Sequence, residues 1–196
     1  MSFVANLGRC AFAALCVAGC ARAWAAQSEK LCSDLEASRY QAVVSGDAQR
    51  IEMEARRFLE ACRTGRPKGL VAVALEEVAA GKRLSGRYSE ALESANGCLQ
   101  YHYEAVGCHA EKALALVGLR LHREAREVVE TGRGVGAREL ARSRLEMDGG
   151  RSIRPRERTQ DEADQRFRGG ELRERLAKRG LERLSAVGST LVGDAK

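Results

Sequence analysis

The stretch GRYSEAL, residues 86–92, decides the fold because it opens a helix that has a second copy further along the chain. In that copy, the stretch LHREA, residues 121–125, opens another helix. Ala91 and Ala125 are 34 residues apart, and so are Tyr88 and His122. A fixed spacing of this length is the signature of a helical repeat in which each unit is one pair of helices.

GRYSEAL closely resembles the turn and second-helix start of the tetratricopeptide family, whose repeat has this same length. The resemblance implies that Gly86 turns the chain, that Tyr88 packs in a groove between helices, and that the small Ala91 lets paired helices approach. The second copy keeps Ala125 and carries Arg120 where a glycine is expected. The resemblance therefore implies stacked helix pairs and a role in binding other proteins.

Apolar residues at helical spacing outline the other helices of the chain. The predicted helices cover residues 28–44, 47–63, 69–81, 87–100, 105–118 and 121–131, with a shorter capping helix at 136–147. An earlier turn at Gly46 precedes Gly86 by more than one repeat length, so the first helix pair is off the period. Runs of alternating β-branched and aromatic residues are absent, which gives strands little support. The sequence predicts an all-α fold, a short α-solenoid of antiparallel helix pairs over residues 27–148.

Four cysteines lie beyond the leader, Cys32, Cys62, Cys98 and Cys108, and they allow three disulfide connectivities. The predicted helices favour Cys32–Cys62 and Cys98–Cys108, because each pair then joins one helix to its antiparallel neighbour near the same end. The segment CLQYHYEAVGC, residues 98–108, also resembles bacterial cysteine-rich repeat proteins of the tetratricopeptide superfamily. Those proteins place one Cys at the end of a helix and another at the start of the next.

Residues 1–25 have the parts of a cleaved bacterial signal peptide: a short start with Arg9, an uncharged apolar stretch and a small-residue end. Two cleavage sites compete. The stretch VAGC, residues 17–20, resembles the bacterial lipobox, after which residues 1–19 are removed and Cys20 is acylated. The stretch AWA, residues 23–25, resembles the site of the ordinary signal peptidase. We expect an exported protein: an outer-membrane lipoprotein facing the periplasm, or a soluble periplasmic or secreted protein.

Residues 149–196 form a basic tail, with several arginines around Pro155. Residues 171–187 predict an amphipathic helix with Leu172, Leu176, Leu184 and Val187 on one face. The tail is either a helix that folds onto a partner or an anionic surface, or a loosely docked or disordered extension. The net charge of +6 arises from Glu and Arg that interleave along the chain, which is typical of solvated helix faces.

Sites of known chemistry are missing from the sequence. It contains no Gly-rich phosphate loop, nucleophile elbow or zinc-protease motif. The spacing of Cys98, His102, Cys108 and His109 matches no familiar zinc pattern, so disulfides are favoured over a metal site. We expect no catalytic residue, no metal and no other cofactor.

The function that best fits these observations is an exported protein-protein interaction module, an envelope assembly or accessory subunit that holds a partner's peptide or helix in a concave groove. Tyr101, His102 and Tyr103 lie in a predicted turn and form either a partner contact or a cap over helix ends. One alternative is a cell-wall-acting enzyme or its accessory, which requires clustered carboxylates on one concave face. Another is binding of an anionic ligand or nucleic acid through the basic tail.

Overall fold

The structure is a computed structural model that describes the backbone of residues 27–152 and 160–193, and the side chains of residues 27–145 and 169–191. The predicted signal peptide, both cleavage sites and Cys20 lie outside these residues. Within the described residues the chain is entirely helical, which confirms the predicted all-α class. The helices are a first helix at residues 27–45, then α2 (Ala48–Cys62), α3 (Lys68–Leu84), α4 (Tyr88–Tyr101), α5 (Val106–Gly118), α6 (His122–Ser152) and α7 (Gln160–Gly193).

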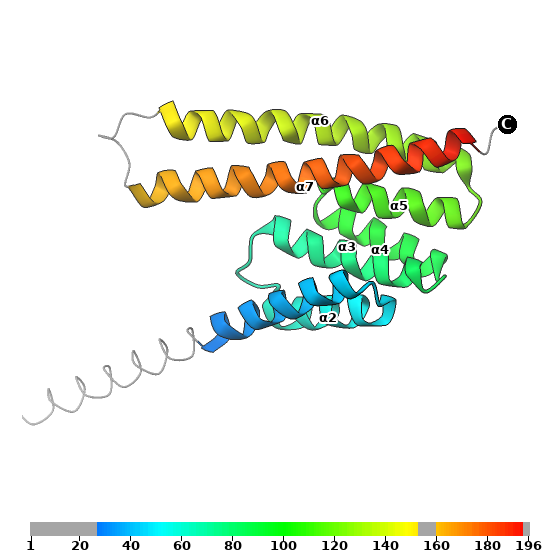
Figure 1. The fold of residues 1–196 in the computed structure, drawn as a ribbon, viewed down its shortest axis with the longest axis horizontal. Helices are drawn as coiled ribbons and strands as arrows, with labels where there is room; N and C mark the ends of the chain where they lie inside the picture. The colour runs from blue at the N-terminus through cyan, green and yellow to red at the C-terminus, as the bar shows by residue number, and fades with distance from the viewer. Residues whose placement is uncertain (1–26, 153–159, 194–196) are drawn as a thin grey trace, which may run out of the picture.

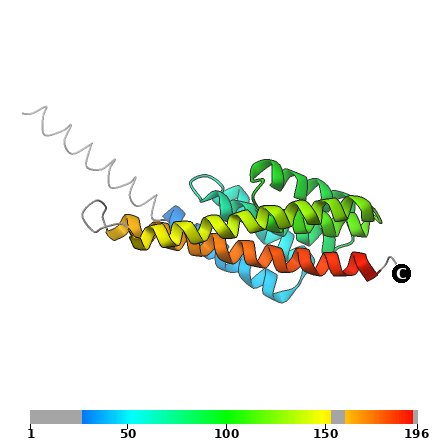
Figure 2. The same cartoon turned by 90° about the horizontal axis from the view of Figure 1, so that it is seen from above.

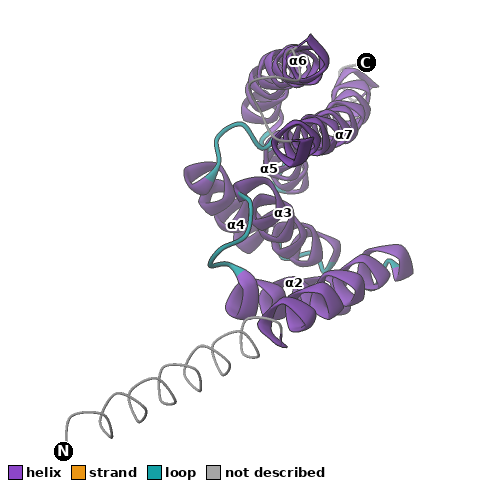
Figure 3. Cartoon of the chain, turned by 90° about the vertical axis from the view of Figure 1, so that its left-hand side faces the viewer, coloured by secondary structure: helices purple, strands orange, loops and turns teal. Residues whose placement is uncertain are grey.

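The helices stack in chain order (Figure 1). From α2 onward each helix contacts the next along the chain, α3 also contacts α5, and α5 contacts α7. Figure 3 shows the first helix and α2 at one edge of the stack and α6 with α7 at the other. Figure 2 shows α6 and α7 lying side by side and extending as a long hairpin past the shorter helices. This α6–α7 hairpin overhangs the beginning of α3, where the candidate site lies.

The turn within each of the first three helix pairs holds one residue in the left-handed conformation. These residues are Gly46 with φ 70°, Gly86 with φ 76° and Arg120 with φ 60°. Gly86 therefore turns the chain, as the tetratricopeptide resemblance implies. Directly after Gly46, the Asp47 carboxylate accepts hydrogen bonds from the backbone N–H groups of Gln49 and Arg50 at 3.0 and 3.2 Å, so it caps the start of α2.

Small residues at the helix contacts bring the helices close together. Ala91 and Ala125, the two alanines at the predicted spacing, are both fully buried. The ring of Tyr88 lies over Gly118 at the end of α5, where a Cβ atom would overlap that ring. These residues therefore lie where helices approach one another closely.

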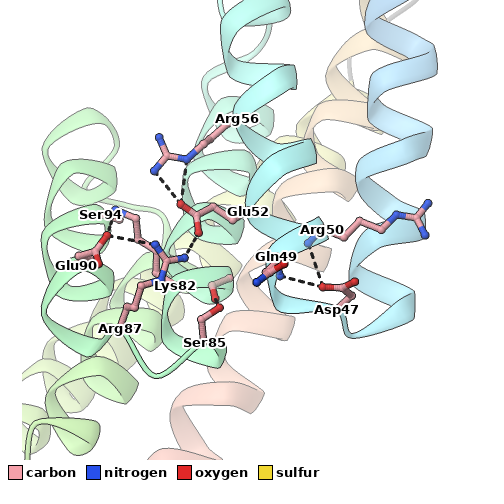
Figure 4. Close-up of polar contacts among 11 residues, drawn as sticks. Asp47, Gln49, Arg50, Glu52, Arg56, Lys82, Ser85, Arg87, Glu90 and Ser94 are labelled. Carbon is pink, nitrogen blue, oxygen red and sulfur yellow. Dashed lines mark hydrogen bonds and ion pairs between the residues drawn. The ribbon is translucent and has the colours of Figure 1, made fainter.

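Polar contacts join the first helix pair to the second near the Gly86 turn (Figure 4). Glu52 of α2 accepts two hydrogen bonds from Arg56 at 2.8 and 3.0 Å and pairs with Arg87 at the start of α4. Burial raises the pKa of the Glu52 carboxyl, but the hydrogen bonds from these two arginines outweigh it and leave the pKa below its usual value. Gly81 of α3 lets α2 approach this closely, because a Cβ atom at Gly81 would lie only 2.8 Å from the Ala48 carbonyl oxygen.

The sequence predicts two helices at 121–131 and 136–147, and this division is wrong, because α6 runs unbroken from His122 to Ser152. The glycines that suggest a break are positions of close approach to α7. A Cβ atom at Gly132 would lie 2.7 Å from the Leu184 side chain, and one at Gly136 would lie 2.6 Å from Leu181. The low helix propensity of glycine is offset here by the packing that it permits.

The predicted boundary between the repeat domain and the tail, at 148/149, falls inside α6 rather than between two units. The amphipathic helix predicted in the tail is part of α7, and it packs on α5 and α6. Leu184 and Val187, two members of the predicted apolar face, are buried in the largest core cluster together with Ala113, Ala125 and Val129. Within the tail, residues 169–191 therefore contribute to the core. The basic stretch at 153–159 lies outside the described residues.

Candidate binding cleft

A cleft of about 470 Å³ lies beneath the overhanging α6–α7 hairpin. It is formed by the beginning of α3, the turn between α4 and α5, and the sides of α6 and α7 that face them. This volume falls within the range of about 300–1,000 Å³ that is typical of ligand-binding clefts. Its apolar lining comes from α3, α5 and α7 and includes Ala72, Val73, Val106, Leu172, Leu176 and Ala177.

The polar lining of the cleft consists of His102 and three residues of each charge. The cations are Lys68, Arg142 and Arg173, and the anions are Glu76, Glu104 and Glu139. An apolar surface with charges of both signs around it is the arrangement found where proteins bind segments of other proteins. Two groups of ion pairs connect the hairpin to the rest of the stack. We call the group around Arg183 the inner clamp and the group around Arg142 the outer clamp.

The inner clamp consists of Arg183, Glu76, Glu111 and Arg83. Arg183 of α7 pairs with Glu76 of α3 and with Glu111 of α5. The Nε atom of Arg83 donates to Glu111 at 2.7 Å. The Glu111 side chain is only 1% exposed and the Glu76 side chain 12%, so loss of a cation would leave a buried charge without compensation. The inner clamp therefore fixes α7 firmly against α3 and α5.

The outer clamp consists of Arg142, Glu104 and Glu139 at the mouth of the cleft. The Nη1 atom of Arg142 on α6 lies 2.9 and 2.8 Å from the two Glu104 oxygens and 2.9 Å from Glu139. The side chains of Arg142 and Glu104 are 48% and 40% exposed. Exposed pairs of this kind contribute about 0–1 kcal/mol to stability. The Arg142–Glu104 contact across the mouth of the cleft is therefore weaker than the buried contacts of the inner clamp.

Two glycines allow the walls of the cleft to meet. A Cβ atom at Gly107 would overlap the Glu76 carboxylate, so α5 begins directly against the inner clamp. A Cβ atom at Gly180 would lie 2.7 Å from the Cβ atom of Val106, so α7 rests on the first turn of α5. The start of α5 is thus packed closely against both α3 and α7.

The His102 imidazole is half-buried among charges of both signs. Burial lowers the pKa of the His102 imidazole, and the nearby Lys68, Arg173 and Arg142 lower it further, while Glu104 acts in the opposite direction. Since the pKa lies below its usual value of about 6.5, His102 is neutral at pH 7. The mouth of the cleft therefore presents cations around a neutral imidazole, with Glu104 as the carboxylate beside it.

The four cysteines form the two pairs that the predicted helices favour. Cys32 and Cys62 are joined with Cα atoms 5.7 Å apart, and Cys98 and Cys108 with Cα atoms 6.1 Å apart. The second disulfide closes the turn that supplies one wall of the cleft, and both of its sulfur atoms lie against the carbonyl oxygen of Ala72. The Cys98–Cys108 disulfide therefore shapes the cleft, whereas the Cys32–Cys62 disulfide joins the first helix to α2.

The predicted partner contacts Tyr101, His102 and Tyr103 do not form one surface. The Arg63 guanidinium lies over the ring of Tyr101 at 5.1 Å, and His102 lines the cleft. Tyr103 packs edge-on against His109, and its carbonyl oxygen lies 3.0 Å from Nε2 of that histidine. Three consecutive residues thus face three different places, because a turn sends their side chains in divergent directions.

The cell-wall enzyme hypothesis requires clustered carboxylates on one concave face, and the buried carboxylates of α3 and α5 are the candidates. Glu76 and Glu111 belong to the inner clamp, and Glu77 pairs with Arg39 of the first helix at 2.8 Å. Burial raises the pKa of Glu77 to about 7 despite the charge of Arg39. The side chains of this last pair are 8% and 6% exposed. Carboxylates that are buried and paired in this way hold helices together and offer little access to a substrate.

Sequence reasoning missed most of the cleft. Lys68 and Arg142 lie far apart in the sequence, and Arg173 falls in the predicted tail. One signal was available: Glu111 lies in a helix that is mostly apolar apart from His109 and Lys112, and a carboxylate buried in such a helix needs a cation as partner. Its partner Arg183 lies on a helix far along the chain, so the positions of the two residues in the sequence did not indicate that they pair.

Comparison of the chain with protein-family models finds no match, and searches of curated proteins and of solved structures find none either. Among the described residues, no group of three or more His, Cys, Asp or Glu side chains is placed to hold a metal ion. In the same part of the chain, no helix is long and apolar enough to cross a membrane.

Proposed function

We propose that this protein is an exported interaction module in which the cleft beneath the α6–α7 hairpin binds a segment of another protein. The observation that carries the proposal is the composition of the cleft: an apolar lining that includes Val73 and Leu176, with charged groups at its mouth. A partner's helix or extended segment matches such a surface through apolar side chains at the centre and charged ones at the rim.

A tetratricopeptide-like arrangement of the helices is part of this proposal. It is supported by the three pair-forming turns with positive φ and by the burial of Ala91 and Ala125, one from each copy of the repeat. It is also supported by the contacts of α3 with α5 and of α5 with α7, because first helices of successive pairs lie side by side in such arrays. In this arrangement α7 takes the place of the first helix of a fourth, incomplete pair.

Export of the protein is supported by two observations. Both disulfides are buried within the fold, and disulfides persist in oxidising compartments outside the cytoplasm. The leader has a lipobox-like stretch that ends at Cys20. We propose that the mature protein works in a bacterial envelope as an assembly or accessory subunit, anchored through Cys20 if the lipobox is used.

Photo-crosslinking in intact cells tests the cleft as the binding site. A photoreactive amino acid replaces Val73, which lines the cleft, or Leu84, which lies exposed at the other end of the same helix. We expect a protein of defined mass to be crosslinked from position 73 and not from position 84. Equal crosslinking from both positions, or crosslinking from position 84 alone, would show that the cleft is not the binding site.

A further inference from the structure

The turn residue Glu104 is half-exposed at the mouth of the cleft, where it contacts Arg142 through both carboxylate oxygens. Its contact with Arg142 crosses from the α4–α5 turn to α6, so the carboxylate lies over the entrance. Exposed ion pairs are screened by salt and contribute little to stability. Glu104 can therefore leave Arg142 without disturbing the inner clamp.

Three cations line the cleft together with Glu104. Lys68 at the start of α3, Arg173 of α7 and Arg142 all act on His102 as nearby positive charges. The other carboxylate of the outer clamp, Glu139, is 10% exposed and lies on the same helix as Arg142, three residues away. The contact between Glu139 and Arg142 lies within one helix, so it does not depend on Glu104.

We propose that Glu104 occupies the place of a partner's carboxylate, and that the cleft binds a protein segment in which an acidic residue is flanked by apolar side chains. The partner's carboxylate replaces Glu104 on Arg142, and its apolar neighbours pack on Val73 and Leu176. This inference rests on the proposed function, because it names the chemistry of the segment that the cleft binds. Complementary charge at the mouth selects the partner, while the apolar surface supplies most of the affinity.

The ion pair offers a test in which its two members have opposite effects. Glu104→Gln removes the internal competitor, so crosslinking from position 73 increases, by about threefold. Arg142→Gln removes the cation that the partner needs, so crosslinking decreases, by about fivefold, and Arg142→Lys restores most of it. The matched control is Arg175→Gln, because Arg175 forms an ion pair with Glu171 at 2.7 Å on α7 and does not line the cleft. It leaves crosslinking unchanged.

The outcomes separate this inference from the proposed function. If both Glu104→Gln and Arg142→Gln lower crosslinking, the pair is only a structural clamp and the inference is wrong. If Glu104→Gln lowers crosslinking and Arg142→Gln raises it, the partner is basic and the inference is also wrong. If the unaltered protein shows no crosslinking from position 73, the proposed function itself fails, and this inference fails with it. Thermal unfolding followed by circular dichroism shows that each variant is folded before crosslinking is compared.

Discussion

Gly86 and Arg120 occupy the same backbone position in two successive helix pairs, 34 residues apart. Both have positive φ, 76° and 60°. The N–H of Gly86 donates to the carbonyl of Arg83, and that of Arg120 donates to the carbonyl of Val117, each at 2.9 Å. The two turns therefore share one backbone conformation, although one has a glycine and the other an arginine at this position.

The left-handed backbone conformation of Arg120 lowers the stability of the fold, and a glycine at this position would relieve the strain. The left-handed conformation costs a residue with a side chain about 1–2 kcal/mol. Glycine avoids this cost, but it also has more conformational freedom in the unfolded chain, which offsets part of the stabilisation. Arg120→Gly is expected to raise the free energy of unfolding by about 0.5–1 kcal/mol, and Gly86→Ala to lower it by about 1 kcal/mol. Urea unfolding of both variants measures the two changes. Destabilisation by Arg120→Gly would mean that the arginine side chain has a stabilising contact that outweighs its backbone strain.

Two glycines of α6, Gly132 and Gly134, are expected to respond to alanine in opposite ways. At Gly132 the new Cβ atom meets Leu184 at 2.7 Å and His109 at 2.9 Å, whereas at Gly134 it meets only the end of the flexible Arg138 side chain at 3.6 Å. Gly132→Ala is expected to lower the free energy of unfolding by about 1–3 kcal/mol. Gly134→Ala is expected to raise it by about 0.5–1 kcal/mol through helix propensity.

Denaturant unfolding of these two variants checks the close packing of α6 on α7. Because both substitutions lie on one helix and have the same effect on the unfolded chain, their difference reports the packing alone. Equal stabilisation by the two would show that α7 does not approach α6 as closely as the structure indicates.

Local features of the fold were predictable because they depend on neighbouring residues. Gly86 and Asp47 mark helix boundaries, and the spacing of Ala91 and Ala125 gives the repeat, so every helix up to residue 118 was placed within about three residues at its ends. The division of α6 was wrong because Gly132 is a helix breaker in isolation but a contact point beside Leu184. That contact involves residues far apart in the sequence, and a local pattern does not report it.

The cleft was less predictable than the fold. Lys68, Arg142 and Arg173 look like solvated helix charges when each is seen in its own segment. Only the packing of the hairpin over α3 brings them together around His102. The sequence did single out His102, although as one member of an aromatic trio whose side chains turn out to diverge.

The two disulfides are expected to contribute differently to stability and to the cleft. Their sequence separations are 30 for Cys32–Cys62 and 10 for Cys98–Cys108. On the loop-entropy account, replacing both cysteines of a pair by alanine costs about 3.5 kcal/mol for the first disulfide and about 2.7 kcal/mol for the second. Thermal unfolding of the two double variants measures the order of these costs.

Hydrogen exchange distinguishes the local effects of the same two double variants. Loss of the Cys98–Cys108 disulfide is expected to speed amide exchange over residues 102–107, which form a wall of the cleft. Loss of the Cys32–Cys62 disulfide is expected to speed exchange in the first helix and to leave residues 102–107 unchanged. The assignment of the second disulfide to the cleft is wrong if both variants affect the wall equally.

The buried pair of Glu77 and Arg39 predicts a specific dependence of stability on pH. The pKa of Glu77 rises from 4.5 to about 7 on folding, because burial penalises the ionised carboxyl more than Arg39 favours it. The folded state therefore binds this proton more tightly than the unfolded state. The resulting stability is fully present below pH 4.5 and is lost as the pH rises through 7, by an amount on the order of 3 kcal/mol.

The variant Glu77→Gln isolates this effect from that of His109. Burial lowers the pKa of His109, so that its contribution has the opposite sign and is lost as the pH falls below 6.5. Both the unaltered protein and the variant carry His109, so the difference between them reports Glu77 alone. In urea unfolding we expect the variant to match the unaltered protein near pH 5 and to be more stable at pH 8. A variant that is less stable at pH 8 would show that the attraction between Arg39 and ionised Glu77 outweighs the cost of burying that carboxylate.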